Sequence, residues 1–299
     1  MKRYYITFVL LSLFMAASAQ SYGTKGVYAT NGSAVIVGQK AARDVYGGTV
    51  INPKFIGSGF NPTIRRAFKH ACEIWEEQIP TTYPLNINVK MGTLVGNNTL
   101  AYVSPRYSSD FFGRERASLK RVAQWDSYWQ LDAEDFINET DAEITFTSRN
   151  VFDFNTDSLQ CNPNKYDFIT VAIQAIGKAL GFYLQAYYDG QYLCPFDSAN
   201  VYTYYVYERM GNMTYQNAIN SGNMSIVKGN KSWPLYCPAT YNSNFSLAYF
   251  AINATDDETM FMQPGISKGT VVRHLGESMQ AVFSAMGWDR AYATGGVAL

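Results

Sequence analysis

The chain has 299 residues, with 24 basic and 24 acidic side chains and two histidines, so its formal net charge near neutral pH is zero. Nucleic acids and anionic membranes bind proteins through an excess of positive charge, which this chain lacks overall. Neither is therefore an expected partner. A chain of this length can bury most of its surface in one or two domains without disulfides or metals.

The first 19 residues have the pattern of a secretory signal peptide. Lys2 and Arg3 precede an apolar run over residues 4–16, and residues 17–19 form a small-residue cleavage site before Gln20. We therefore expect a secreted or otherwise extracytoplasmic protein, in the periplasm or at the cell surface. No later stretch has the roughly 20 apolar residues that a spanning helix needs, so no transmembrane segment is expected.

Four cysteines form an even set in a chain bound for an oxidising compartment: Cys72, Cys161, Cys194 and Cys237. They allow two disulfides in any of three connectivities. A Cys194–Cys237 bridge is the favoured pair, because both residues lie in one loop-rich region.

Residues 20–60 are rich in Gly, Thr and Val, which predicts short strands and turns. The first clear helix is expected over 61–79, with Asn61 as its cap, Pro62 in its first position and apolar residues along one face. His70 falls on the opposite, charged face and is interpreted as a solvated residue.

Strands and a central helix follow. Three segments alternate apolar and polar residues with the period of two that is typical of strands: 85–91, 99–105 and 142–149. The helix is expected from Tyr166 to Leu180, with Gly181 as its stop. A buried stripe lies on one of its faces, while Gln174 and Lys178, four residues apart, share a different face.

Residues 183–299 are expected to be mostly loops and short strands, with a last helix over 276–288. The tyrosine-rich segment 201–211 is interpreted as strand residues packed on a core, the alternative being a recognition surface. The whole pattern predicts an α+β domain over 61–290, with an upper lobe at about 61–182, a lower lobe at about 183–290 and a cleft between them. Residues 291–299 form a short tail.

The segment YDFITVAIQAIGKALGF, residues 166–182, resembles the zinc helix of secreted zincin metallopeptidases, whose usual form is D-F-[VI]-[TS]-V-x-x-H-E-[IL]-G-H-x-L-G-F. Further segments resemble the family in the same order: 60–94, 142–158, 195–206 and 233–288. The likeness covers most of residues 50–290. It implies a zincin-like metallopeptidase fold, in which a twisted sheet and an active-site-type helix form two lobes around a cleft.

Carried over position by position, the family's active site is degenerate. The first zinc-binding His falls on Gln174, the catalytic Glu on Ala175 and the second His on Lys178. The third ligand falls on Tyr249, or on Leu184 if the extended form of the motif applies. A catalytic zinc needs three His, Asp, Glu or Cys ligands and a base, and a lysine ammonium repels the ion. We therefore expect no catalytic residue, no zinc and no other cofactor.

The two histidines offer no substitute chemistry. His274 aligns with a family histidine outside the ligand set and is interpreted as structural, and His70 lies on a solvated face. No Ser/His/Asp arrangement is supported.

Lys178 has two interpretations. A lysine in an apolar cleft can lose its proton and act as a base or nucleophile. Alternatively, its ammonium occupies the place of the metal, with a carboxylate or solvent to balance it, because an unpaired buried ammonium is costly. The second interpretation is favoured. The candidate carboxylates by position are Asp197, Asp256, Asp257 and Glu258.

The sequence thus predicts an exported pseudo-peptidase that binds a peptide, protein or glycan in a retained cleft lined by Lys178, Phe182, Tyr249 and Thr145. An edge strand over 142–149 could pair with an extended peptide through backbone groups. The alternatives are an active hydrolase that uses Lys178, and a structural or surface-assembly protein whose cleft is filled by its own aromatics. A closed, side-chain-packed cleft around Lys178 would favour the last.

Overall fold

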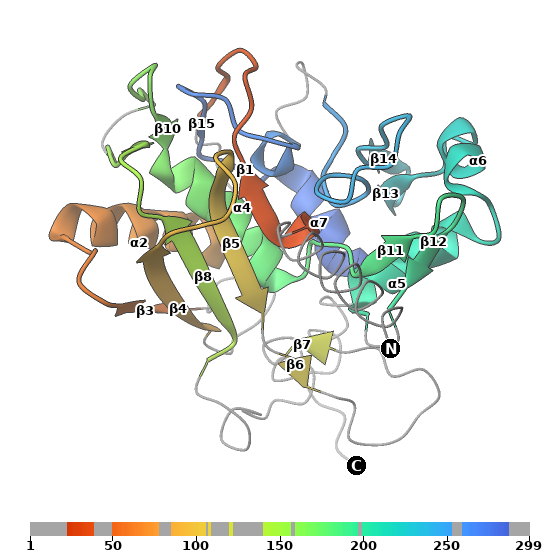
Figure 1. Cartoon of the computed structure of the whole chain (residues 1–299), viewed down its shortest axis with the longest axis horizontal. Coiled ribbons are helices and arrows are strands. Elements are labelled where there is room, and N and C mark those ends of the chain that lie inside the picture. Colours follow the sequence, from red (N-terminus) through yellow and green to blue (C-terminus); the bar gives the residue numbers. More distant parts are fainter. Residues whose placement is uncertain are drawn as a thin grey trace, which may run out of the picture.

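The computed structural model describes most of the chain, with the ranges 23–38, 50–77, 85–105, 107–108, 120–121, 140–156, 159–196, 199–252 and 259–286. The predicted signal peptide and the tail lie outside these residues. The described part is a mixed α+β structure, as predicted, built around one five-stranded sheet with the strand order β1-β5-β8-β4-β3 (Figure 1).

The strands of this sheet are β1 (Gly26–Tyr28), β3 (Ile51–Ile56), β4 (Leu85–Gly92), β5 (Thr99–Pro105) and β8 (Ala142–Thr147). β3, β4 and β8 run parallel to one another. β5 is antiparallel to β8, and β1 is antiparallel to β5. The three strands predicted from alternation are therefore confirmed as β4, β5 and β8.

The prediction that 142–149 forms an edge strand is wrong. β8 lies inside the sheet, where Thr145 faces Lys90 of β4 on one side and Tyr102 of β5 on the other. Both rows of backbone groups on β8 are therefore already paired. The edges of the sheet are β1 and β3, and alternation alone does not specify which strand is outermost.

Two helices cover one side of the sheet, α2 (Pro62–Glu76) and α4 (Phe168–Leu180), which pack against each other (Figure 1). α2 begins as predicted, because the Asn61 side chain accepts a hydrogen bond from the Ile64 amide at 2.9 Å. α4 ends at Gly181, whose φ of 131° suits a residue without a side chain.

The segment after α4 is more helical than expected. It contains α5 (Val201–Met210) and α6 (Tyr215–Asn220), the hairpins β11 (Ala186–Tyr188) with β12 (Leu193–Pro195) and β13 (Ser225–Lys228) with β14 (Lys231–Pro234), and the predicted last helix as α7 (Gly276–Ala285). Short elements complete the fold: η1 (Gly23–Lys25), β2 (Ile36–Val37), β6 (Tyr107–Ser108), β7 (Lys120–Arg121), β9 (Phe152–Asp153), β10 (Tyr166–Asp167), η3 (Met260–Met262) and β15 (Val271–Val272).

The strand interpretation of 201–211 is wrong, because α5 occupies this segment. The Asn200 side chain caps the helix by accepting a hydrogen bond from the Thr203 amide at 2.9 Å. Tyr202, Val206 and Met210, spaced by four, form its buried face. The alternating tyrosines suggested a period of two, but the cap and the spacing of these three residues decide the structure.

One hydrophobic cluster includes residues of both predicted lobes, among them Val89, Phe146, Ile173, Tyr202 and Phe250. The expected disulfides do not form in the structure, where all four cysteines are free. Cys194 lies on the exposed β11–β12 hairpin, whereas Cys237 follows β14. Among the described helices, none has the length and apolar character required to cross a membrane.

Candidate functional site

The positions that the zincin resemblance assigns to metal chemistry lie on α4, and all of this helix is buried. Gln174 and Lys178 are one turn apart on the same face, with Ala175 beside them. The helix is therefore covered on every side, and this face does not border open solvent.

Lys178 is held by a carbonyl group and by aromatic rings. Its Nζ donates a hydrogen bond to the Ala248 carbonyl at 2.6 Å and lies 3.6 Å from the centroid of the Tyr249 ring. The Phe182 ring is 5.6 Å away. A cation over an aromatic face is attracted by the negative π surface. Full burial lowers the pKa of Lys178 well below its usual value.

Lys178 is fully buried, so of the expected partner or solvent access only a partner is possible, and the Ala248 carbonyl is one. A carboxylate partner stays a prediction. The four proposed carboxylates, Asp197, Asp256, Asp257 and Glu258, lie outside the described residues.

Tyr249, the position of the third ligand in the resemblance, links Lys178 to the beginning of the chain. Its ring is fully buried, and its hydroxyl donates a hydrogen bond to the Gly26 carbonyl of β1 at 2.7 Å. Burial raises the pKa of Tyr249 well above its usual value, which keeps the phenol protonated. Tyr249 therefore contacts Lys178 through its neutral ring and donates a hydrogen bond to β1 through its hydroxyl.

Gln174 points toward a different neighbour. Its Nε2 donates to the Gln263 carbonyl at 3.0 Å. Its Oε1 and the Nε2 of Gln263 are buried without a hydrogen-bond partner among the described residues. Unpaired buried polar atoms destabilise a fold, so this part of the site is not optimised for stability.

Gly177 lies between Gln174 and Lys178 and allows two side chains to approach α4. A Cβ atom at this position would be 2.4 Å from Cε of Met262 and 3.2 Å from the ring of Trp75. The Trp75 ring is fixed, because its Nε1 donates to the Ile173 carbonyl at 3.1 Å. A side chain at position 177 would therefore have to displace the flexible end of Met262 and press on the Trp75 ring.

The beginning of α4 is anchored by a buried ion pair that was not predicted. Arg273 donates to both carboxylate oxygens of Asp167, at 2.7 and 2.9 Å. The same carboxylate accepts hydrogen bonds from the amide and hydroxyl of Thr170 at 2.7 and 2.6 Å. The Thr170 hydroxyl in turn accepts a hydrogen bond from the Val272 amide. Asp167 has the position of a cap, but its distant partner could not be identified from sequence.

The remaining predicted site residues divide into two groups. Phe182 belongs to the cluster around Lys178 and packs against Tyr202, with ring centroids 4.9 Å apart. Thr145 is half-buried on β8, where its partners across the sheet are Lys90 and Tyr102, so its neighbours are not those of Lys178.

The N-terminal segment closes the site, a role that no local pattern in its sequence predicts. β1 pairs with β5, and the Thr24 hydroxyl donates to the Leu184 carbonyl and accepts from the Leu184 amide, at 2.8 and 2.9 Å. Leu184, the alternative third-ligand position, is therefore engaged through its backbone. Residues 23–28 cover β5 and the Tyr249 side of the cluster.

The residues present do not fit a catalytic zinc ion. A glutamine, an alanine, a lysine and a tyrosine occupy the four family positions, and Nζ of Lys178 occupies the space beside the Tyr249 ring. Within the described ranges, no cluster of three or more His, Cys, Asp or Glu side chains could hold a metal. His70 lies on the outer face of α2, where its ring contacts Glu73 at 3.1 Å, and His274 is half-buried.

Comparisons of the chain with known protein families, with curated proteins and with solved structures gave no match. The function must therefore be inferred from the arrangement of the side chains themselves.

Proposed function

We propose that the chain is an exported, catalytically inactive relative of zincin metallopeptidases, in which the Lys178 side chain fills the place of the metal. The observation that carries this proposal is the contact of Lys178 Nζ with the Tyr249 ring at 3.6 Å. Two positions 71 residues apart, both assigned to zinc ligands by the resemblance, are neighbours inside the protein. Their proximity supports a common origin as parts of one metal site.

The hydrolase alternative is not supported by this geometry. A nucleophilic or basic lysine must reach its substrate within hydrogen-bonding distance. The amine of Lys178 is fully buried and donates to the Ala248 carbonyl. Its lowered pKa follows from burial and does not indicate catalysis by itself, because structural groups are perturbed in the same way.

Two observations favour a role through the outer surface over binding of a ligand in the cleft. The Lys178 cluster is filled by the protein's own aromatic side chains, Phe182 and Tyr249. β8 is paired with β4 on one side and with β5 on the other, and β5 is paired with β8 and β1. Neither strand therefore offers an open edge for an extended peptide. We therefore infer a structural or surface-assembly role, with a peptide, protein or glycan partner bound outside this cluster.

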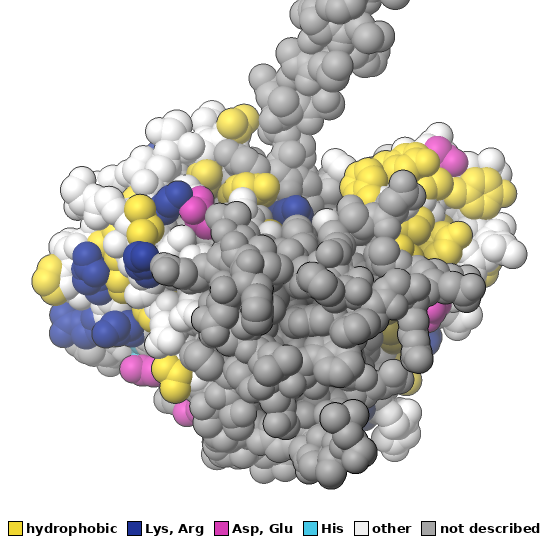
Figure 2. Space-filling view, turned by 90° about the horizontal axis from the view of Figure 1, so that it is seen from below, with side chains coloured by type: hydrophobic (Ala, Val, Ile, Leu, Met, Phe, Trp, Pro, Cys, Tyr) yellow, Lys and Arg dark blue, Asp and Glu magenta, His cyan; other side chains and the backbone are white. Residues whose placement is uncertain are grey.

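The β11–β12 hairpin is the surface that best suits such a contact. Tyr187, Tyr192 and Phe196 are exposed there, and the rings of Tyr187 and Phe196 lie 5.9 Å apart. Figure 2 shows hydrophobic side chains gathered at the end of the molecule where this hairpin and α5 lie. Exposed groups of large aromatics are typical of interaction sites.

The proposal is tested by rebuilding the active site. Purified mature protein should cleave no member of a broad peptide library. The triple variant Gln174→His, Ala175→Glu and Lys178→His should bind zinc weakly in calorimetric titrations, because Tyr249 still occupies the third ligand position. Adding Tyr249→His should increase the zinc affinity by about tenfold or more. Equal zinc affinities for the triple and quadruple variants would contradict the assignment of Tyr249.

A further inference from the structure

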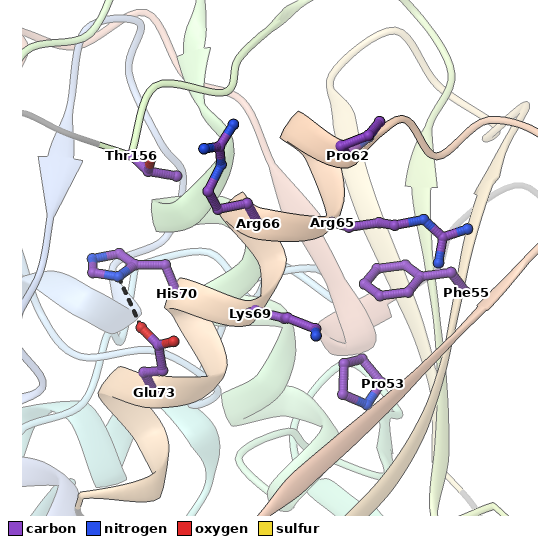
Figure 3. Close-up of a pocket in the computed structure, with 9 residues that line it drawn as sticks. All are labelled: Pro53, Phe55, Pro62, Arg65, Arg66, Lys69, His70, Glu73 and Thr156. Carbon is purple, nitrogen blue, oxygen red and sulfur yellow. Dashed lines mark hydrogen bonds and ion pairs between the residues drawn. The ribbon is translucent and has the colours of Figure 1, made fainter.

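A pocket on the outer face of α2 carries a concentration of positive charge. It has a volume of about 690 Å³ and is formed by α2, β3 and the loop after β9. Its lining is made of Pro53, Phe55, Pro62, Arg65, Arg66, Lys69, His70, Glu73 and Thr156 (Figure 3). The volume is within the range of roughly 300–1,000 Å³ that small-molecule sites occupy.

The charge of this pocket comes from the spacing of basic residues on α2. Ile64, Ala67, Phe68 and Ala71 turn toward the core, so Arg65, Arg66 and Lys69 share the outer face and are exposed. Glu73 is the only acidic residue of the lining, and its carboxylate contacts the His70 ring at 3.1 Å. Three permanent cations are thus opposed by one carboxylate in a chain with no net charge.

This arrangement is unfavourable for the helix itself. Arg65 and Lys69 are four residues apart, a spacing at which like charges repel. Arg65 lies at the end of the first turn of α2, where the helix dipole favours negative charge, and that turn contains no acidic residue. Neither Arg66 nor Lys69 forms an ion pair or hydrogen bond with a described residue. Repulsion of this kind is relieved when an anion binds.

The walls of the pocket hold one of the cations in place. The Arg65 guanidinium lies 4.7 Å from the Phe55 ring centroid, and its Nε donates to the Phe60 carbonyl at 3.3 Å. Pro53 and Pro62 add rigid apolar surface. Figure 3 shows Arg65 and Lys69 on the side of the helix that faces Phe55 and Pro53 of β3, whereas Arg66 is directed toward Thr156 and borders that part of the pocket. Figure 2 shows basic side chains gathered on the side of the molecule where α2 and β3 lie in Figure 1.

We propose that this pocket binds a phosphate or sulfate group, with Arg65, Arg66 and Lys69 as the charged contacts. Guanidinium groups bind tetrahedral oxyanions through paired N–H donors, and lysine adds a mobile charge. The apolar surface of Pro53 and Phe55 suits a ring that carries the group as an ester. The site is separate from the Lys178 cluster, so the inference stands independently of the proposed function.

Calorimetric titration of the mature protein tests this proposal, with inorganic phosphate, inorganic sulfate, phenyl phosphate and phenyl sulfate as probes. One saturable site is expected, with an affinity that falls as sodium chloride is added. Tighter binding of the phenyl esters would assign an ester ligand, and equal binding of the inorganic ions would assign a free oxyanion; both results support the site. Absence of saturable binding by all four probes would overturn it.

A matched pair of variants locates the site. Arg66→Gln with Lys69→Gln should weaken binding by about tenfold or more, because two of three charged contacts are lost. Lys228→Gln with Lys268→Gln removes the same charge from exposed positions elsewhere and should leave the affinity unchanged. Equal losses in both variants would show nonspecific attraction and contradict the proposal. All four positions are exposed, and circular dichroism spectra of both variants should match that of the wild type.

Discussion

Lys178 Nζ lies 3.6 Å from the centroid of the Tyr249 ring, and both side chains are fully buried. The same Tyr249 donates its hydroxyl proton to the Gly26 carbonyl, so one tyrosine joins the central helix to the first strand. The buried amine is accommodated here because a carbonyl accepts its hydrogen bond and an aromatic face covers it. The cluster stabilises a closed structure in the region that the resemblance assigns to catalysis.

Lys178 should make the stability of the protein depend on pH. Its pKa is lowered by burial in the folded state, whereas the unfolded chain has the ordinary value of 10.5. Between these two pKa values the unfolded state binds more protons, so the free energy of unfolding rises with pH in that interval. The slope is at most about 1.4 kcal/mol per pH unit.

The free energy of unfolding is measured by urea titration of the wild type and of Lys178→Met from about pH 6 to about pH 10. This range ends near the ordinary lysine pKa. The buried cysteines and tyrosines have raised pKa values and act in the opposite direction at high pH, but they are common to both proteins. The difference between wild type and variant should therefore increase with pH. A difference that is constant over the whole range would show that Lys178 keeps an ordinary pKa.

Tyr249→Phe should loosen the N-terminal strand. The change removes the 2.7 Å hydrogen bond to the Gly26 carbonyl and retains the ring beside Lys178. We expect a loss of about 1–2 kcal/mol in the free energy of unfolding and faster amide exchange over residues 23–28. Hydrogen exchange followed by mass spectrometry gives both quantities. Tyr207→Phe, at an exposed position on α5, is the control and should change neither.

Gly177→Ala should destabilise the protein, although alanine is the better helix former by about 1 kcal/mol. The new methyl group would overlap Met262 Cε and press on the Trp75 ring, which its hydrogen bond to Ile173 holds in place. Overpacking of this kind costs about 1–3 kcal/mol. In a Met262→Ala background the overlap with Cε is gone and the Trp75 contact remains, so Gly177→Ala should cost less than in the wild type. If the substitution costs the same in both backgrounds, Met262 is not the residue that requires the glycine.

Asp167→Asn should be among the most damaging single substitutions. It removes the carboxylate that pairs with Arg273 and caps α4, and it leaves a buried guanidinium without its charge partner. The expected loss is about 3–5 kcal/mol. Adding Arg273→Met to Asp167→Asn should recover part of this loss. Additive losses in thermal or urea unfolding would mean that the two residues act separately.

Local patterns in the sequence were sufficient to predict the helices and strands that surround the site. Asn61 and Pro62 predict the start of α2, Gly181 predicts the end of α4, and alternation predicts β4, β5 and β8. Each signal depends on residues within one turn or one strand, so no knowledge of tertiary structure is needed. The juxtaposition of Lys178 with Tyr249 followed from the resemblance, which aligned both with ligand positions.

The features that the sequence did not predict depend mainly on contacts between residues far apart in the chain. The position of β8 inside the sheet depends on its pairing with both β4 and β5, which come from separate, earlier parts of the chain. The pairing of Asp167 with Arg273 spans 106 residues, and neither sequence neighbourhood indicates the other. Alternating tyrosines also suggested a strand at 201–211, where burial of one side of α5 determines a helix. The disulfide prediction rested on compartment and proximity in sequence, and such arguments do not fix the geometry that two cysteines require.

Zinc content, measured by mass spectrometry on mature protein never exposed to chelators, is the most direct test of the central claim that Lys178 occupies the place of a metal. We expect zinc well below one ion per chain, and no increase when zinc is added to the Lys178→Met variant, because Gln174 and Tyr249 are poor ligands. One tightly held zinc ion per wild-type chain, retained through dialysis, would contradict it.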